Sequence, residues 1–235
     1  SILMPDMPRF LWWSGALPDN PVAQKIFGHL AEQCDRLMID TGQMKEPSID
    51  LVALSHLTLQ EEQGAALGDL NWHRFARWRH LLAQTFDLPE LRAQWRAIRR
   101  GTVEWAGQDS AVPVEVLLYL GWLASSLGWT VADVRPDGFD FVDRREQPVS
   151  FALLRRELSA RGLVSIELAT ERAVIRLQPI DQSLESLVDG HSRLAVPRPH
   201  LELASVLESE LGILTRNPSY EAALRVAERL AAASR

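Results

Sequence analysis

The sequence predicts an α/β fold built in two parts. Residues 1–128 are expected to form a tryptophan-rich α/β domain with βαβ-type parallel strands. Residues 129–235 are expected to form an antiparallel β-meander with C-terminal helices, an α+β arrangement. Two observations favour this division. All eight tryptophans fall within the first 129 residues, and strand–helix alternation then gives way to short alternating runs separated by tight turns.

The opening residues predict a βαβ unit. A short apolar strand at Arg9–Trp13 is followed by Asn20-Pro21, which combines a helix N-cap with proline at the first helical position. The helix should run to about Gln33. Arg36–Asp40 is then apolar enough for a strand that is buried on both faces. Strand, helix and strand in this order imply parallel pairing with a right-handed crossover.

Further elements complete the first part. Helices are expected at about 49–63 and 70–86, and an apolar helix at Val114–Leu127. Residues 97–105 have the pattern of a strand, although the arginines around them could also continue a helix. Within the helix at 70–86, Trp78 shares the apolar face, so we expect its side chain in the core.

The second part has a different pattern. Asp137-Gly138, between two apolar runs, is typical of a short hairpin. The remaining elements are strands at 149–155, 163–169 and 172–177, a connector at 179–199, and helices at about 200–214 and 218–233.

Composition excludes several classes of protein. The formal net charge of −6 argues against a nucleic-acid binder, which needs a basic surface. No run of eighteen apolar residues is present, so we expect no membrane-spanning helix. Cys34 is the only cysteine, which excludes an intramolecular disulfide and a multi-cysteine zinc site and favours a cytoplasmic location.

The segment Asp69–Arg79 is the densest in aromatic and basic residues, with two tryptophans and three arginines in eleven positions. Tryptophan and arginine dominate the energetics of protein interfaces, but they also build buried corners of folds. The sequence leaves both interpretations open for this segment. The candidate partner-binding residues are Trp12, Trp13, Asp69, Asn71, Trp72, Arg74 and Arg79.

The motifs that usually carry catalysis or cofactor binding are missing from the sequence. It contains no glycine-rich nucleotide cradle, no G-x-S-x-G turn and no H-E-x-x-H pair, so we expect no catalytic residue, metal or cofactor. Asp40 follows a strand at the edge where α/β sheets bind ligands, although helix capping is its simpler role. A possible anion-binding group, for which a solvated surface is the simpler interpretation, contains Arg92, Arg96, Arg99 and Arg100.

An ordered set of motifs resembles one family. The motifs are Phe10–Trp13, Cys34–Asp40, Asp69–Trp72 with Trp78-Arg79, Gly121–Ser125 with Leu127–Trp129, and Asn217-Pro218 with Tyr220. Together they resemble the OpcA family, the glucose-6-phosphate dehydrogenase assembly proteins. The resemblance implies a non-enzymatic role in the oxidative pentose phosphate pathway. Such a protein would bind glucose-6-phosphate dehydrogenase and act as an allosteric activator by favouring its active oligomer.

The resemblance also sets two expectations for this chain. Family members carry sequence before the point where Ser1 stands, so we expect a fragment that lacks its N-terminal part. Redox control through paired cysteines, which some members show, is excluded here because Cys34 stands alone. The rival hypothesis is a sugar-phosphate-binding protein or enzyme that uses Asp40 and the arginines at 92–100. A third possibility is a self-associating structural protein.

Overall fold

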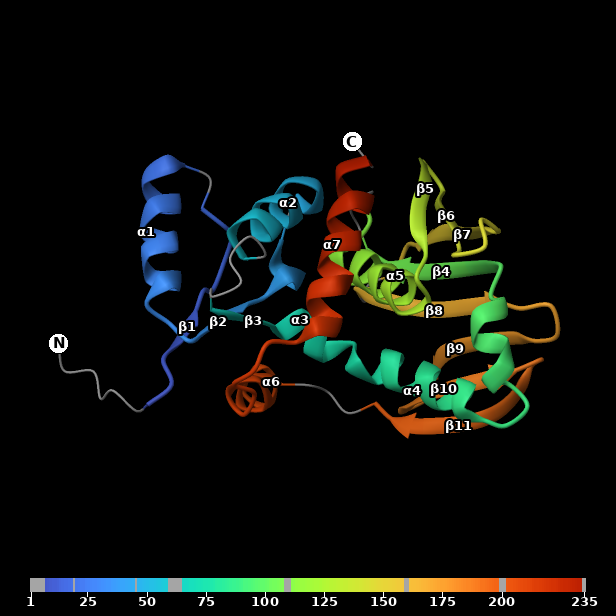
Figure 1. Cartoon of the computed structure of the whole chain (residues 1–235). Coiled ribbons are helices and arrows are strands. Elements are labelled where there is room, and N and C mark those ends of the chain that lie inside the picture. The colour runs from blue at the N-terminus through green and yellow to red at the C-terminus, as the bar shows by residue number, and fades with distance from the viewer. Residues whose placement is uncertain are drawn as a thin grey trace.

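The computed structural model describes residues 7–18, 20–44, 46–58, 65–107, 111–158, 161–198 and 202–233. These residues form two sheets with helices packed on and between them (Figure 1). One sheet has three parallel strands near the N-terminus, and the other has eight mostly antiparallel strands. The predicted mixed α/β class is therefore confirmed.

The three-stranded sheet contains the predicted βαβ unit. β1 (Phe10–Trp12) and β2 (Arg36–Ile39) pair in parallel, and α1 (Pro21–Glu32) connects them. The side chain of Asn20 accepts a hydrogen bond from the amide of Ala23 at 2.9 Å, and the helix opens on a proline. This is the N-cap that the sequence predicted, because it satisfies one of the free amides of the first turn.

A third parallel strand was not predicted from the sequence. β3 (Ala66–Asp69) pairs with β2 and follows α2 (Pro47–Thr58). Its four residues include Gly68, which gives the segment a weak strand pattern. The glycine is required by packing, since a Cβ there would lie 2.6 Å from a carboxylate oxygen of Glu210 and 2.8 Å from the guanidinium of Arg36.

The predicted helix at 70–86 is divided in two. α3 (Leu70–Arg74) ends at Phe75, whose backbone leaves the helical region at φ −98° and ψ 14°, and α4 (Ala76–Asp87) starts beyond it. A 3₁₀ helix, η2 (Arg92–Ala97), then leads into β4 (Arg100–Ala106). The arginine-rich segment is thus helical at first, and the predicted strand begins at Arg100.

The eight-stranded sheet has the order β11-β10-β9-β8-β4-β7-β6-β5. β4 lies between β7 and β8 and runs parallel to β7, so this sheet draws on residues from both sides of residue 128. The strands not yet defined are β5 (Thr130–Arg135), β6 (Gly138–Val142), β7 (Pro148–Arg156), β8 (Gly162–Ala169), β9 (Val174–Ile180), β10 (Ser183–Val188) and β11 (His191–Pro197).

The predicted connector at 179–199 is wrong, because β10 and β11 occupy most of it. Asp181, with φ 51°, starts the turn between β9 and β10. Asp189 (φ 51°) and Gly190 (φ 81°) form the turn between β10 and β11. Asp and Gly tolerate these left-handed conformations better than other residues, so two tight hairpins replace the expected irregular chain.

Three helices complete the structure: α5 (Val114–Leu127), α6 (Leu203–Leu211) and α7 (Pro218–Ala233). α5 and α7 approach so closely that a Cβ on Gly121 would overlap the carbonyl oxygen of Ala223. α7 also contacts α2 and β5, so it joins the N-terminal sheet to the larger one (Figure 1).

The helices α4, α5 and α7 contact the eight-stranded sheet and cover one of its faces. Val103, Ile166 and Leu177 are fully buried in the core, while their neighbours Glu104 and Arg176 point to the opposite face, as alternation along a strand requires. Among the described residues, no helix combines the length and apolar character needed to cross a membrane.

Candidate functional site

The carboxyl ends of β2 and β3 hold a cluster of polar residues, which we call the carboxyl-edge cluster: Asp40, Thr41, Asp69, Asn71 and Arg74. Asp69 ends β3 and caps α3, and its carboxylate accepts hydrogen bonds from the amides of Asn71 (2.9 Å) and Thr41 (3.1 Å) and from the Thr41 hydroxyl (2.7 Å). Asn71 donates in turn to that hydroxyl at 3.1 Å. Burial raises the pKa of Asp69 to about 6, against the opposing effect of these donors.

Arg74 and Asp40 form the accessible side of the carboxyl-edge cluster. The guanidinium donates to both carboxylate oxygens, at 2.6 and 2.8 Å, in a bidentate pair. Asp40 also caps a short 3₁₀ helix, η1 (Thr41–Gln43), by accepting from the Gly42 amide at 3.1 Å. The capping role predicted for Asp40 is thus confirmed, and its carboxylate is already neutralised by an arginine.

The Trp72 and Arg79 side chains stack inside the protein. The guanidinium carbon of Arg79 lies 3.3 Å from the centroid of the Trp72 ring, and Arg79 donates to the Trp72 carbonyl at 3.2 Å. Burial lowers the pKa of Arg79 to about 9. Trp72 also packs edge-on against Phe75. Both Trp72 and Trp78 are buried, with 6% and 7% of their surface exposed, so the core position predicted for Trp78 is confirmed and extends to Trp72.

A buried ion pair that the sequence analysis missed lies beneath the same elements. Arg36 of β2 donates to Glu210 of α6 at 2.6 Å, and the two side chains are 2% and 4% exposed. Arg36 also donates to the carbonyl of Thr215 at 3.0 Å, and His73 lies 3.7 Å from the second oxygen of Glu210. Although burial opposes it, the nearby His73 and the hydrogen bond from Arg36 hold the pKa of Glu210 below its ordinary value.

The seven candidate partner-binding residues have different positions. Asp69, Asn71, Trp72 and Arg79 are buried at 1–7% exposure, because they cap α3 or pack in the core, so they form no accessible surface here. Arg74 is about one-third exposed. The other two are Trp12 and Trp13, which we describe next.

Trp12 and Trp13 point into different surroundings, as adjacent residues of an extended segment should. Trp12 is 42% exposed. Trp13 is half-buried, packs edge-on against Phe27 at 4.9 Å between ring centroids, and donates its indole N–H to the carbonyl of Ala16 at 3.0 Å. Trp12 is therefore the tryptophan of this pair that is available to a partner.

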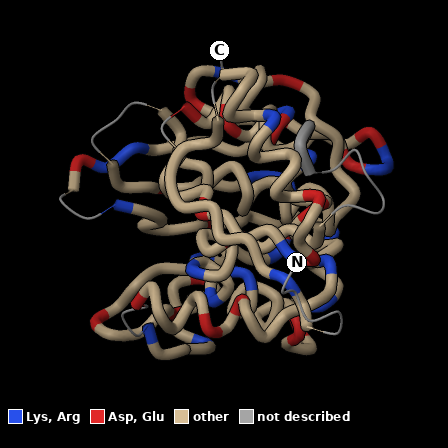
Figure 2. The backbone as a smooth tube through the Cα atoms, turned by 90° about the vertical axis from the view of Figure 1, so that its left-hand side faces the viewer, with Lys and Arg blue, Asp and Glu red and all other residues tan. Residues whose placement is uncertain are grey.

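The outer face of α1 exposes an apolar stripe, which we call the α1 apolar surface: Val22, Ile26 and Leu30. These residues are spaced four apart on one helical face, and they are 70%, 55% and 40% exposed. An adjacent face of the helix buries Phe27 against Trp13. Viewed from the side of α1, basic and acidic residues are interspersed along the backbone, without a large area of one sign (Figure 2).

The predicted arginine group at 92–100 is spread over several elements. Arg92 and Arg96 are exposed on η2, and Arg100 is exposed at the start of β4. Arg99 is paired with Asp143 at 3.1 Å. Arg92 donates to the carbonyl of Asp87 at 3.2 Å. Two of the four guanidiniums are thus already engaged.

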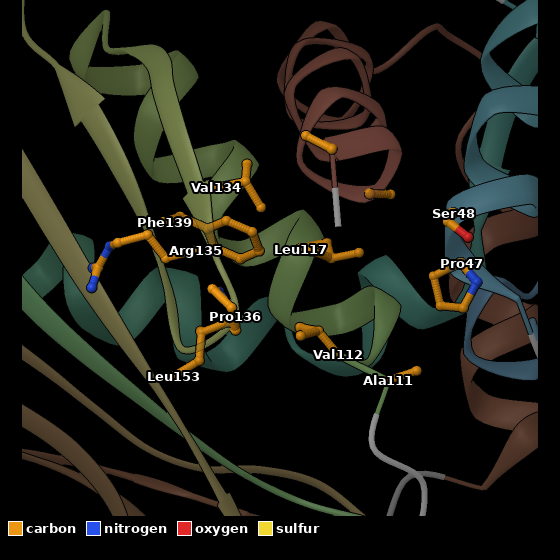
Figure 3. Close-up of a pocket in the computed structure, with 12 residues that line it drawn as sticks. Pro47, Ser48, Ala111, Val112, Leu117, Val134, Arg135, Pro136, Phe139 and Leu153 are labelled. Carbon is orange, nitrogen blue, oxygen red and sulfur yellow. The ribbon is translucent and has the colours of Figure 1, made fainter. Parts of the chain in front are cut away.

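A cavity of about 370 Å³ lies where the β5–β6 hairpin faces the starts of α2 and α5 and the end of α7 (Figure 3). Its lining is mainly apolar, with Val112 from the segment before α5, Leu117 from α5 and Phe139 from β6. Arg135 also borders it, but its guanidinium is held by Asp140 at 2.8 Å. The described lining contains no histidine, cysteine or carboxylate, so general acid–base groups do not converge on this cavity.

Two family models match the chain in succession. The first describes the N-terminal domain of a glucose-6-phosphate dehydrogenase subunit, and it matches residues 1–56. The second describes the C-terminal domain of a glucose-6-phosphate dehydrogenase subunit, and it matches residues 65–224.

Curated relatives also match the sequence. An OpcA protein from Nostoc punctiforme is 37% identical over 141 residues, which cover 60% of this chain and 28% of the relative. An OpcA protein from Synechococcus elongatus is 34% identical over 140 residues, covering 60% of this chain and 29% of the relative. The matched region therefore spans less than a third of the length of these relatives.

Solved structures with a similar fold are much more distant in sequence. A dehydrogenase (MviM) from Clostridium difficile has a TM-score of 0.56 at 9% identity, covering 95% of this chain and 77% of that one. The 3-ketoreductase KijD10 from Actinomadura kijaniata has a TM-score of 0.53 at 10% identity, covering 88% and 72%. At such low identity the likeness shows a shared fold alone. The family models, by contrast, match most of the sequence in order, and the chain belongs to the OpcA family.

Proposed function

We propose that this chain is a non-catalytic part of an assembly factor that binds glucose-6-phosphate dehydrogenase. By binding the active oligomer better than other forms, it would activate the enzyme in the oxidative pentose phosphate pathway. The size of that activation is limited by the difference in affinity for the two forms. The proposal is supported by the descriptions of the two matching family models, both of which refer to a subunit of this dehydrogenase.

The observation that carries the proposal is the α1 apolar surface. Large apolar side chains that are exposed together on one helix face are typical of interaction sites. Ile26 is 55% exposed at the centre of the stripe, and Trp12, on the strand that α1 follows, is 42% exposed. We infer that this end of the molecule contacts the dehydrogenase.

The rival hypothesis needs groups that are engaged elsewhere. A sugar phosphate bound at the carboxyl edge would have to displace Arg74 from Asp40, and one bound through Arg99 would have to displace Asp143. The assembly role requires no such rearrangement.

We also propose a cytoplasmic location, where the half-buried Cys34 would stay reduced. Burial raises the pKa of the Cys34 thiol, and this disfavours the reactive thiolate.

The test combines the chain with the glucose-6-phosphate dehydrogenase of the same organism. Complex mass is measured by light scattering, and initial rates are measured over a range of substrate concentrations. We expect a complex of defined mass and a change in the substrate dependence of the rate. Absence of both would refute the assembly role.

A pair of variants locates the contact. Ile26→Asp should weaken the complex by about 30-fold or more, the effect of losing an interface anchor worth about 2 kcal/mol. The matched control is Val174→Asp, since Val174 is 40% exposed on β9, far along the chain from α1. Equal weakening by both variants would show that α1 is not the contact.

A further inference from the structure

A second cavity, of about 360 Å³, lies at one end of the eight-stranded sheet, on the face opposite α4, α5 and α7. We call it the arginine groove. It is formed where β4 and β9 end and β8 begins, and Arg198 approaches it from the end of β11. Three arginines line it: Arg161, Arg176 and Arg198.

The charges in the arginine groove do not cancel. Glu104 lines it but accepts two hydrogen bonds from Arg156, at 3.0 and 3.1 Å, and these bonds hold the pKa of Glu104 below its ordinary value. Arg176 is paired with Glu167 at 3.0 Å. Within the described part of the chain, Arg161 and Arg198 have no ion-pair partner.

The remaining lining can recognise polar groups of a ligand. The Gln178 amide lines the groove, and Leu158 adds an apolar side chain that is 50% exposed, whereas the buried Ser165 hydroxyl is bonded to Glu104. The volume falls in the range of sites that bind small molecules. Because the whole chain carries a net charge of −6, the two uncompensated guanidiniums are a local feature and not part of a basic surface.

We propose that the arginine groove binds a small phosphate ester. Guanidinium groups match the oxygens of phosphate in geometry and charge, so Arg161 and Arg198 would bind the phosphate. Gln178 is suited to a hydroxyl group of the same ligand, since an amide both donates and accepts hydrogen bonds. The anion site then lies at this end of the sheet and not at the arginines of η2. This proposal does not depend on the assembly role.

The test uses titration calorimetry of the full chain at constant ionic strength. The probes are inorganic phosphate and glycerol 3-phosphate, with glycerol as the uncharged match. We expect saturable binding of both phosphates, tighter for the ester, and no binding of glycerol. Arg161→Gln and Arg198→Gln should each raise the Kd about 10-fold or more, the loss of one charge-assisted contact.

Arg172→Gln is the matched control, because Arg172 is exposed in the β8–β9 turn, at the opposite end of the same two strands. It should leave the Kd unchanged, and all three variants should unfold at the wild-type temperature. The proposal fails if the wild-type chain binds neither phosphate, or if the control weakens binding equally. It also fails if the groove variants lose only the complex with the dehydrogenase, because the groove would then bind an acidic protein segment.

Discussion

The three-stranded and eight-stranded sheets differ in what lies against their buried parts. The large sheet packs an aromatic group against its helices, with Trp129, Phe141 and Phe151 within 6.0 Å of one another by ring centroids. The small sheet is fully buried along β2 and β3 and shares the apolar core, and it is also joined to the C-terminal part by the buried Arg36–Glu210 ion pair. Apolar packing stabilises both sheets, and a buried ion pair additionally fixes the position of the small one.

This difference has a physical basis. A sheet of three short strands buries less apolar area than a sheet of eight, so directional contacts contribute a larger share to fixing its orientation. A buried ion pair adds little net stability but penalises every arrangement in which one partner is left alone. The position of the small sheet should therefore depend on this ion pair in addition to packed volume, whereas the large sheet depends on packed volume.

The largest expected loss of stability follows a change in the aromatic group of the large sheet. Phe151→Ala should lower the free energy of unfolding by about 4 kcal/mol, because it leaves a cavity in a fully buried site. The loss should be the same at low and high salt, measured by urea denaturation. A strong salt dependence would break the distinction between the two sheets.

The second-largest loss of stability is expected when one partner of the buried Arg36–Glu210 ion pair is removed. Glu210→Ala should cost about 3 kcal/mol, because the guanidinium of Arg36 would remain buried without its carboxylate. The double variant with Arg36→Met is the control, and it should recover part of the loss. If the double variant is no more stable than Glu210→Ala, the pair does not act as a charged unit.

The pH dependence of stability tests another buried carboxyl group, on α5. Burial raises the pKa of Glu115, in the first turn of α5, from 4.5 to about 7. Between these values the folded state holds a proton that the unfolded state releases, so stability falls as pH rises through this range. Glu115→Gln should remove this fall and be about 2 kcal/mol more stable than wild type at pH about 8.

Thermal unfolding across the pH range measures this difference. At pH about 4 the two proteins should unfold alike, because Glu115 is then protonated in both the folded and the unfolded state. A variant that is less stable than wild type at every pH would instead show that the carboxylate is favourably paired.

The smallest stability effect is expected at the α1 apolar surface. Ile26→Asp should change the free energy of unfolding by less than about 0.5 kcal/mol, since its side chain is mostly in water. Phe27→Ala, one residue along and 1% exposed, should cost about 3 kcal/mol. Comparable losses would mean that Ile26 is part of the core.

Local sequence signals predicted much of the fold. Asn20-Pro21 marked the start of α1, and the hairpin signal near Asp137 produced the β5–β6 pair with a two-residue loop. β3 was not predicted because four residues that include a glycine are too few to show the alternation of apolar and polar residues that marks a strand. β10 and β11 were not predicted because the prolines at their borders indicated a connector. In the structure, aspartates in the left-handed conformation form the turns before and after β10.

The site was harder to predict, because its contacts are long-range. Arg36 and Glu210 are 174 residues apart, and only an arginine opening an otherwise apolar strand hinted at a buried partner. The aromatic and basic segment 69–79 could be recognised as unusual, but only the fold shows that Asp69 caps a helix and Arg79 covers Trp72. The sequence does not show which side chains of α1 are exposed, because this depends on which other elements pack against the helix.

The position of α7 has a consequence for synthesis. α7 packs against both α2 and α5, with Gly121 allowing its backbone to approach, yet it is the last of these helices to leave the ribosome. Until it emerges, the sides of α2 and α5 that face α7 are uncovered. The nascent chain therefore exposes apolar surface that chaperones can bind, and the protein reaches its final shape only after translation of α7.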